Sequence, residues 1–145
     1  MRVLVVEDNL DWEIIWKQIF DVFAEKVELV WATNVAEAMT RIGYFDSVGT
    51  IFDVIVADIF LSGSLTGVDL FNYLDQRHRQ RFIFVSSVSA MRLRALLGAG
   101  GDDVRILQKP FTKREAISEL RLIQKSVGNE QELPPPVNAV ARAQI

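Results

Sequence analysis

Five short apolar runs, most of them rich in Val and Ile, recur along the chain with longer stretches of mixed polarity between them. The runs cover residues 3–6, 27–31, 54–57, 82–85 and 104–107. Runs that are apolar throughout are typical of strands buried on both faces of a parallel sheet. The pattern therefore predicts a five-stranded sheet with helices on both sides.

The stretches between the runs have helical periodicity. In the first of them, apolar residues at positions 12, 15, 16, 19, 20 and 23 fall on one face of a helix. Residues 34–42, 67–77, 89–97 and 112–126 are predicted as four further helices. Strands alternating with helices indicate a doubly wound α/β domain, and 145 residues are enough for one such domain.

Composition excludes several classes of function. The chain has no cysteine, which excludes thiolate chemistry and cysteine-based zinc sites. It has one histidine, His78, which is little basis for a Ser–His–Asp triad. A net charge of −3 argues against a nucleic-acid surface. No apolar run approaches the roughly 18–20 residues of a membrane span, and the charged N-terminus is unlike a signal peptide. We expect a cytoplasmic protein.

The character of the sequence changes after residue 126. Gly128 is expected to stop the last helix, and polar residues and three consecutive prolines, 134–136, follow it. We interpret residues 1–126 as the folded domain and residues 127–145 as a proline-containing tail or linker.

Chemically active residues stand where the predicted strands end. Glu7 and Asp8 follow the first strand, Asp58 the third, Ser86 the fourth and Lys109 the fifth. In an open parallel sheet these ends meet at one edge, which is where ligands bind. Adjacent carboxylates repel unless a cation or proton is shared, and an all-oxygen cluster suits Mg²⁺. The sequence thus predicts a magnesium site at this edge.

Each of these residues also has a simpler interpretation when taken alone. Asp8 or Asn9 could cap the helix that follows, Ser86 could be an ordinary loop hydroxyl, and Lys109 could be solvated. Asp58 is harder to explain in this way, because an acid directly after a buried strand is costly to place. The convergence of all of them on one edge favours a functional site.

Three other features have structural explanations. The glycine-rich residues 98–101 follow a helix, so they indicate a helix C-cap and turn rather than a nucleotide loop. Trp12 and Trp16, one helical turn apart, are expected to pack in or near the core, with a partner-binding face as the alternative. His78 is expected on the surface at the C-terminal end of a helix.

Four stretches together resemble the receiver domain of two-component response regulators over residues 1 to about 125: "VLVVEDN", "DVIVADIFLSGSLTGVDL", "FIFVSS" and "ILQKPF". The resemblance implies a flavodoxin-like (βα)5 fold with strand order 2-1-3-4-5. It implies that Asp58 accepts a phosphoryl group from a sensor histidine kinase or phosphotransfer protein. Ser86 then takes the place of the switch hydroxyl, and Lys109 that of the lysine that contacts the phosphoryl group.

The resemblance also implies the metal ligands. Mg²⁺ would be held by the carboxylates of Glu7, Asp8 and Asp58 and by the backbone carbonyl of Phe60. The bond between Lys109 and Pro110 would be cis, as in the family pattern.

The sequence departs from the family at several positions. Ser62 stands where a proline is usual, in a loop that is one residue longer. Ile106 replaces an aromatic residue whose inward swing is part of the usual switch. Phe60 and Val88, two positions after Asp58 and Ser86, are apolar where many relatives are polar.

Two classes of function follow from these features. The first is a receiver that catalyses only its own phosphorylation and dephosphorylation, is otherwise no enzyme, and signals to a downstream protein. The second is a pseudo-receiver that acts as an interaction module without phosphorylation. A phosphatase with an aspartyl-phosphate intermediate is disfavoured, since Phe60 stands where such enzymes carry a second acid.

The expected output surface is the face formed by residues 89–97, 104–107 and 112–126, which could also form a homodimer. No output domain that would bind DNA is recognisable in the chain. It is either a complete single-domain regulator or a piece that stops in a linker.

Overall fold

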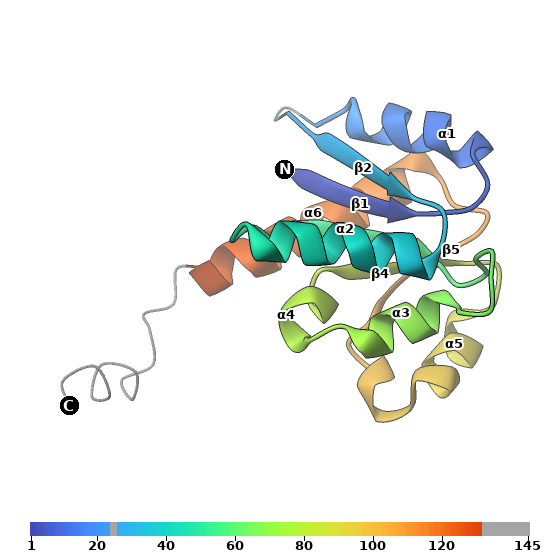
Figure 1. Cartoon of the computed structure of the whole chain (residues 1–145). Helices are drawn as coiled ribbons and strands as arrows, with labels where there is room; N and C mark the ends of the chain where they lie inside the picture. The colour runs from blue at the N-terminus through green and yellow to red at the C-terminus, as the bar shows by residue number, and fades with distance from the viewer. Residues whose placement is uncertain (24–25, 132–145) are drawn as a thin grey trace, which may run out of the picture.

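The computed structural model describes residues 1–23 and 26–131 (Figure 1). Five parallel strands form one sheet in the order β2-β1-β3-β4-β5, which confirms the predicted fold class. The strands are β1 (Arg2–Val6), β2 (Glu28–Ala32), β3 (Val54–Asp58), β4 (Phe82–Ser86) and β5 (Arg105–Gln108).

Helices cover both faces of this sheet (Figure 1). They are α1 (Asp11–Phe20), α2 (Val35–Ser47), α3 (Gly67–Tyr73), α4 (Gln76–Arg79), α5 (Ala90–Leu97) and α6 (Lys113–Gln131), with a 3-10 turn η1 (Gly98–Gly101) after α5. The buried residues of α1 and α6 form one apolar cluster, and those of α2, α3 and α5 form another. None of the helices in the described ranges is long and apolar enough to cross a membrane.

The all-apolar strands are explained by burial on both sides. Successive residues of β1 alternate between the clusters: Leu4 and Val6 join the cluster of α2, α3 and α5, while Val3 and Val5 join the cluster of α1 and α6. Val3 pairs in register with Val54 and Val6 with Ala57. This pairing brings the carboxyl ends of β1 and β3 together, as the predicted site requires.

The predicted helix over residues 67–77 is in fact two helices, α3 and α4, so the expected total of five helices is wrong. Leu74 between them is extended, with φ −86° and ψ 151°. Asp75 then caps α4 by accepting a hydrogen bond from the backbone N–H of His78 at 3.0 Å. Aspartate at this position satisfies a free N–H and starts a new helix, which hydrophobic periodicity alone does not detect.

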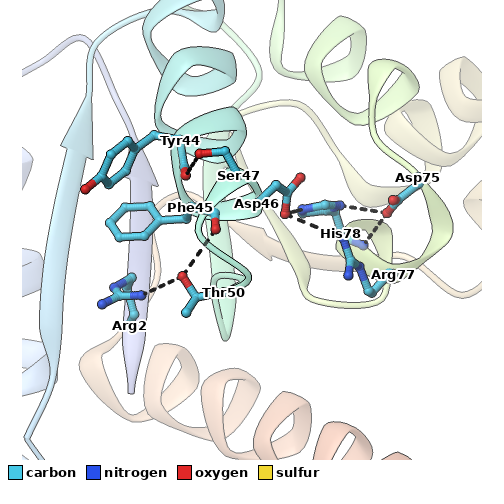
Figure 2. A network of polar contacts seen from close by, with 9 residues as sticks. All are labelled: Arg2, Tyr44, Phe45, Asp46, Ser47, Thr50, Asp75, Arg77 and His78. Carbon is cyan, nitrogen blue, oxygen red and sulfur yellow. Dashed lines mark hydrogen bonds and ion pairs between the residues drawn. The ribbon is translucent and has the colours of Figure 1, made fainter.

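The expectation that His78 lies on the surface is also wrong. Its exposed fraction is 3 %, and its ring lies between the carboxylates of Asp75 and Asp46 (Figure 2). Asp46 belongs to α2, so the imidazole joins α2 to α4. Two acids placed far apart in the sequence make this burial possible.

Gly128 does not end the last helix, because α6 continues to Gln131. A glycine in a helix interior costs about 1 kcal/mol relative to alanine, which packing of the apolar face can offset. Val127, directly before it, is still buried against the sheet. Prolines 134–136 lie outside the described residues, and the domain boundary stays a prediction.

The glycine-rich stretch after α5 matches its expected role. Gly98 is the C-cap of α5 and has φ +65°, a conformation that favours glycine. The turn then continues as η1. Trp16 is buried and Trp12 partly buried in the cluster of α1 and α6, as predicted.

Candidate functional site

The predicted site residues are carried by four adjacent strand ends. Glu7 follows β1, Asp58 is the last residue of β3, Ser86 is the last residue of β4, and Lys109 follows β5. The register pairs Asp58 with Val85 and Ser86 with Gln108, so these strand ends stand side by side. The parallel sheet therefore gathers residues from distant parts of the sequence at one edge.

Lys109 binds both buried acids. Its Nζ atom lies 2.7 Å from Oδ2 of Asp58 and 3.3 Å from Oε2 of Glu7. Its backbone N–H donates to the carbonyl oxygen of Ser86 at 2.7 Å. The ammonium group thus supplies the positive charge that the clustered acids require.

Both carboxylate oxygens of Asp58 accept hydrogen bonds. Oδ2 accepts from Lys109, and Oδ1 accepts from the backbone N–H of Phe60 at 3.1 Å. Behind it, a Cβ at Gly67 would collide with the carbonyl oxygen of Asp58, so only glycine lets α3 begin this close to β3. The Asp58 carboxylate is thereby held in one orientation at the edge of the sheet.

Glu7 is an unusual acid. Its pKa is raised from 4.5 to about 7, mainly by burial and also by a hydrogen bond with the Asp58 carboxyl group, while the N–H of Asn9 and the charge of Lys109 lower it. Oε1 of Glu7 accepts the hydrogen bond from Asn9 at 3.1 Å. The ionised form of Glu7 is therefore disfavoured in this buried place, although Lys109 contacts its carboxylate.

Asp8 is not brought into this cluster. It is exposed, and no three acidic or histidine side chains in the described ranges stand together in an arrangement that could hold a metal ion. The predicted set of Glu7, Asp8, Asp58 and the Phe60 carbonyl is thus only partly assembled. Its oxygen donors nonetheless suit a hard cation.

Neither Asp8 nor Asn9 is the N-cap residue of α1, although this was the simpler interpretation of these two residues. The N-cap position of α1 is Leu10, which has no side-chain cap. The side chain of Asn9 instead accepts a hydrogen bond from the N–H of Asp11 at 3.0 Å and so shapes the loop between β1 and α1.

Ser86 is fully buried and faces its own loop. Its Oγ accepts a hydrogen bond from the backbone N–H of Val88 at 2.9 Å. Ser89 then caps α5 by accepting from the N–H of Arg92 at 3.3 Å. The loop that follows β4 is therefore organised by two serine side chains, one at the site and one at the start of α5.

Trp12 is a site residue that sequence reasoning missed. The Nζ atom of Lys109 lies 4.4 Å from the centre of the Trp12 ring, and the same ring lies 5.3 Å from the ring of Phe111. From the sequence, Trp12 was expected to pack in or near the core or to form a partner-binding face, not to contact the site. Its position at the start of the helix after Glu7 and Asp8 is the signal that could have indicated proximity to the site.

Comparison with known proteins agrees with this geometry. Residues 3–121 match the model of the response regulator receiver domain. The chain belongs to this family. No significant match was found among curated proteins.

Solved receiver domains have the same fold. The receiver domain of the Francisella response regulator 1452 is 25 % identical, with a TM-score of 0.64, and the match covers 87 % of this chain and 98 % of that one. The signal receiver domain of an HD domain-containing protein from Pseudomonas fluorescens Pf-5 is 18 % identical, with a TM-score of 0.72 and coverages of 92 % and 93 %. That of a signal transduction histidine kinase from Syntrophus aciditrophicus is 22 % identical, with a TM-score of 0.68 and coverages of 92 % and 97 %.

The residues interpreted above as departures from the family pattern differ in their surroundings. Phe60 is 58 % exposed, Val88 is partly exposed, and Ile106 is partly buried against the cluster of α2, α3 and α5. Ser62 donates a hydrogen bond to the carbonyl oxygen of Thr33 at 3.2 Å, which ties the loop after β3 to the end of β2. The bond between Lys109 and Pro110 is cis, as the family pattern implied.

Proposed function

We propose that this receiver domain accepts a phosphoryl group on Asp58 from a sensor histidine kinase or a phosphotransfer protein. The observation that carries the proposal is the position of Asp58, which ends β3 with one carboxylate oxygen 2.7 Å from Nζ of Lys109. The other oxygen accepts the N–H of Phe60. A fixed, paired carboxylate at the ligand-binding edge of a parallel sheet is well placed for phosphoryl transfer.

The transfer would be a substitution at phosphorus. An oxygen of Asp58 forms a bond to the phosphorus of a phosphohistidine, and the P–N bond breaks with its electron pair leaving on the imidazole, which then takes a proton. Lys109, already within hydrogen-bond distance of the carboxylate, is placed to stabilise negative charge on the transferred oxygens. The oxygen of the Ser86 hydroxyl accepts from the N–H of Val88, and its proton would be free to donate to one of those oxygens.

We further propose that Mg²⁺ assists, held by the carboxylates of Glu7, Asp8 and Asp58 and the backbone carbonyl of Phe60. When bound, the ion supplies neutralisation of negative charge around the phosphoryl group. The residues of the chain supply the positioning: Asp58 is oriented by Lys109 and Phe60, and the carboxylate oxygens are donors that suit a hard cation.

The output would be a contact made by the face of α5, β5 and α6, either with a downstream protein or with a second copy of the chain. β5 is an edge strand, so its outer side is free within the sheet. A hollow of about 590 Å³ lies on this face and is lined by residues that include Ile106, Lys109 and Glu119. Since Lys109 belongs to both the site and the hollow, a change at Asp58 can reach the surface directly.

Phosphorylation by acetyl phosphate in the presence of Mg²⁺ tests the proposal. We expect the intact mass to increase by one phosphoryl group, bound in a linkage that is stable to acid and labile to base. Asp58→Asn should abolish it, whereas Asp102→Asn, at an exposed turn, should not. Label accepted by Asp58→Asn at the wild-type rate would contradict the assignment.

The same experiment distinguishes a receiver that is phosphorylated from a pseudo-receiver that is not. A folded wild-type protein that accepts no phosphoryl group from acetyl phosphate or from candidate kinases would favour an interaction module. We expect no turnover of other phosphorylated substrates, because the proposed activity is limited to Asp58 itself.

A further inference from the structure

Lys109 has an aromatic partner in addition to its two acids. Its Nζ atom contacts Asp58 at 2.7 Å and Glu7 at 3.3 Å, and the centre of the Trp12 ring lies 4.4 Å away. This distance is within the roughly 6 Å range over which a ring face attracts a cation. The Lys109 side chain is 18 % exposed, so the ring acts in a partly desolvated place, where such contacts are stronger than at an exposed site.

The Trp12 ring is itself held in place by Phe111, which lies in the segment after β5. Phe111 lies 5.3 Å from Trp12 and 5.7 Å from the buried ring of Trp16, measured between ring centres. Phe111 follows Pro110 directly, so the segment that carries Lys109 also packs against the first turn of α1. The three rings connect this turn to the segment after β5 and fix where the lysine ammonium can stand.

A ring and a carboxylate hold a lysine in different ways. A carboxylate neutralises the ammonium charge and competes with a phosphoryl group for it. An aromatic face attracts the ammonium through its quadrupole but carries no net charge. The ring can therefore keep Lys109 near Asp58 while the lysine exchanges a carboxylate oxygen for a phosphoryl oxygen.

We propose that Trp12 is a positioning residue that holds the ammonium group of Lys109 beside Asp58 for phosphoryl transfer. The role rests on the proposed function, because it acts through Lys109 and has no reacting atom of its own. It adds to that function a third partner of the lysine, contributed by α1 rather than by a strand end.

The contact itself can be measured without phosphorylation. In the metal-free protein, the side-chain CH₂ protons of Lys109 next to Nζ should be shifted upfield by the ring current of Trp12, with Lys109→Gln used to assign them. They should return to the range of the other lysines in Trp12→Leu and stay shifted in Trp12→Phe. Unchanged Lys109 resonances in Trp12→Leu would overturn the inference, whatever the phosphorylation assays give.

The effect on the reaction is measured with acetyl phosphate, which avoids any contribution from kinase docking. At saturating donor, Trp12→Leu should lower the rate constant for phosphorylation by roughly threefold to thirtyfold, the size expected from losing one cation–aromatic contact. The donor concentration for half-maximal rate should change little. Trp12→Phe and Trp12→Tyr, which keep a ring, should recover most of the rate.

Trp31→Leu is the matched control, since Trp31 is another partly buried tryptophan in the cluster of α1 and α6. It should disturb packing without slowing phosphorylation. Equal rates for Trp12→Leu and wild type, or equal slowing by Trp31→Leu, would overturn the positioning role. A wild-type protein that is not phosphorylated at all would instead contradict the proposed function, and the resonances of Lys109 would still decide whether the contact exists.

Discussion

Nδ1 of His78 lies 2.7 Å from Oδ1 of Asp75, and Nε2 on the other side of the ring lies 3.2 Å from Oδ1 of Asp46 (Figure 2). The imidazole is buried, and Arg77 reaches the same oxygen of Asp46 at 3.5 Å. The short helix α4 is thereby attached to the C-terminal part of α2 through polar contacts. Both nitrogens of the buried ring therefore have a partner, as buried polar groups generally do.

We expect His78→Leu to lower the free energy of unfolding by about 1–3 kcal/mol, because it removes both contacts and leaves Asp46 without its buried partner. Urea unfolding at neutral pH measures this. Arg77→Leu is the control: the Arg77 side chain is 59 % exposed, so the loss should stay below about 1 kcal/mol. Equal losses in the two variants would mean that burial of the ring is not what matters.

Asp75→Asn should reduce stability in a way that depends on pH. The hydrogen bond from the His78 side chain holds the pKa of Asp75 below its usual value of 3.8. A group with a lowered folded-state pKa stabilises above its unfolded-state pKa, and this contribution is lost as pH falls through the folded-state pKa. We expect a loss of under about 1 kcal/mol at pH 7, since Asp75 is largely exposed, and no difference from wild type in strong acid. Asparagine still caps α4, so unfolding curves across pH isolate the charge effect.

Glu7→Gln should increase, rather than decrease, the free energy of unfolding in metal-free buffer. The pKa of Glu7 is raised from 4.5 to about 7, mainly by burial, so its favourable contribution is present below pH 4.5 and is lost as pH rises through 7. Glutamine cannot ionise, and the variant should exceed wild type in unfolding free energy by roughly 1–3 kcal/mol at pH 8, with little difference near pH 4. Thermal or urea unfolding with a chelator present measures this. Asp8→Asn, at an exposed position, should shift stability by less than about 0.5 kcal/mol; a gain as large as that of Glu7→Gln would contradict burial as the cause.

The sheet and most of the site could be predicted because they depend on local pattern. All-apolar runs require burial on both faces, and the parallel connection then brings the ends of β1, β3, β4 and β5 to one edge. Glu7, Asp58, Ser86 and Lys109 are found there because each directly ends or follows a strand.

What could not be predicted depends on partners that are distant in the sequence. His78 was expected at the surface, because nothing in its neighbourhood shows that Asp46 lies against its ring. The contact of Trp12 with Lys109 joins residues nearly a hundred positions apart. Gly128 failed as a helix stop because packing of the preceding turn, through Val127, outweighs its low helix propensity.

The response of the proposed output face to phosphorylation should be smaller than in a variant with an aromatic residue at position 106. Ile106 is packed against buried residues on the α2, α3 and α5 side and has no ring that could swing inward. Amide shifts on adding a beryllofluoride phosphoryl mimic should therefore be smaller in α5, β5 and α6 of the wild type than in Ile106→Tyr. Large shifts confined to α1 would contradict the assignment of this face as the output surface.

The phosphorylated state should be long-lived, because the apolar side chains of Phe60 and Val88 are predicted to border the approach to Asp58. Hydrolysis needs a water molecule in line with the bond between Asp58 and phosphorus, and a polar side chain can help to hold it. Phe60 is bulky and 58 % exposed, its N–H binds Oδ1 of Asp58, and the N–H of Val88 binds Oγ of Ser86. Neither of the two side chains can hydrogen-bond water.

Replacing both residues by polar ones should therefore speed release of phosphate. We expect the double variant Phe60→Asn/Val88→Glu to lose phosphate about tenfold to a hundredfold faster than wild type, which corresponds to roughly 1.4–2.8 kcal/mol in the barrier. Each single variant should release phosphate at a rate between those of the wild type and the double variant. The control is Leu65→Asn, because Leu65 is also exposed and apolar in the loop after β3 but is not predicted to border the path of the water. Phosphate release from labelled protein measures the rates, and a half-life of seconds in wild type that the double variant leaves unchanged would show that Phe60 and Val88 do not control access of water.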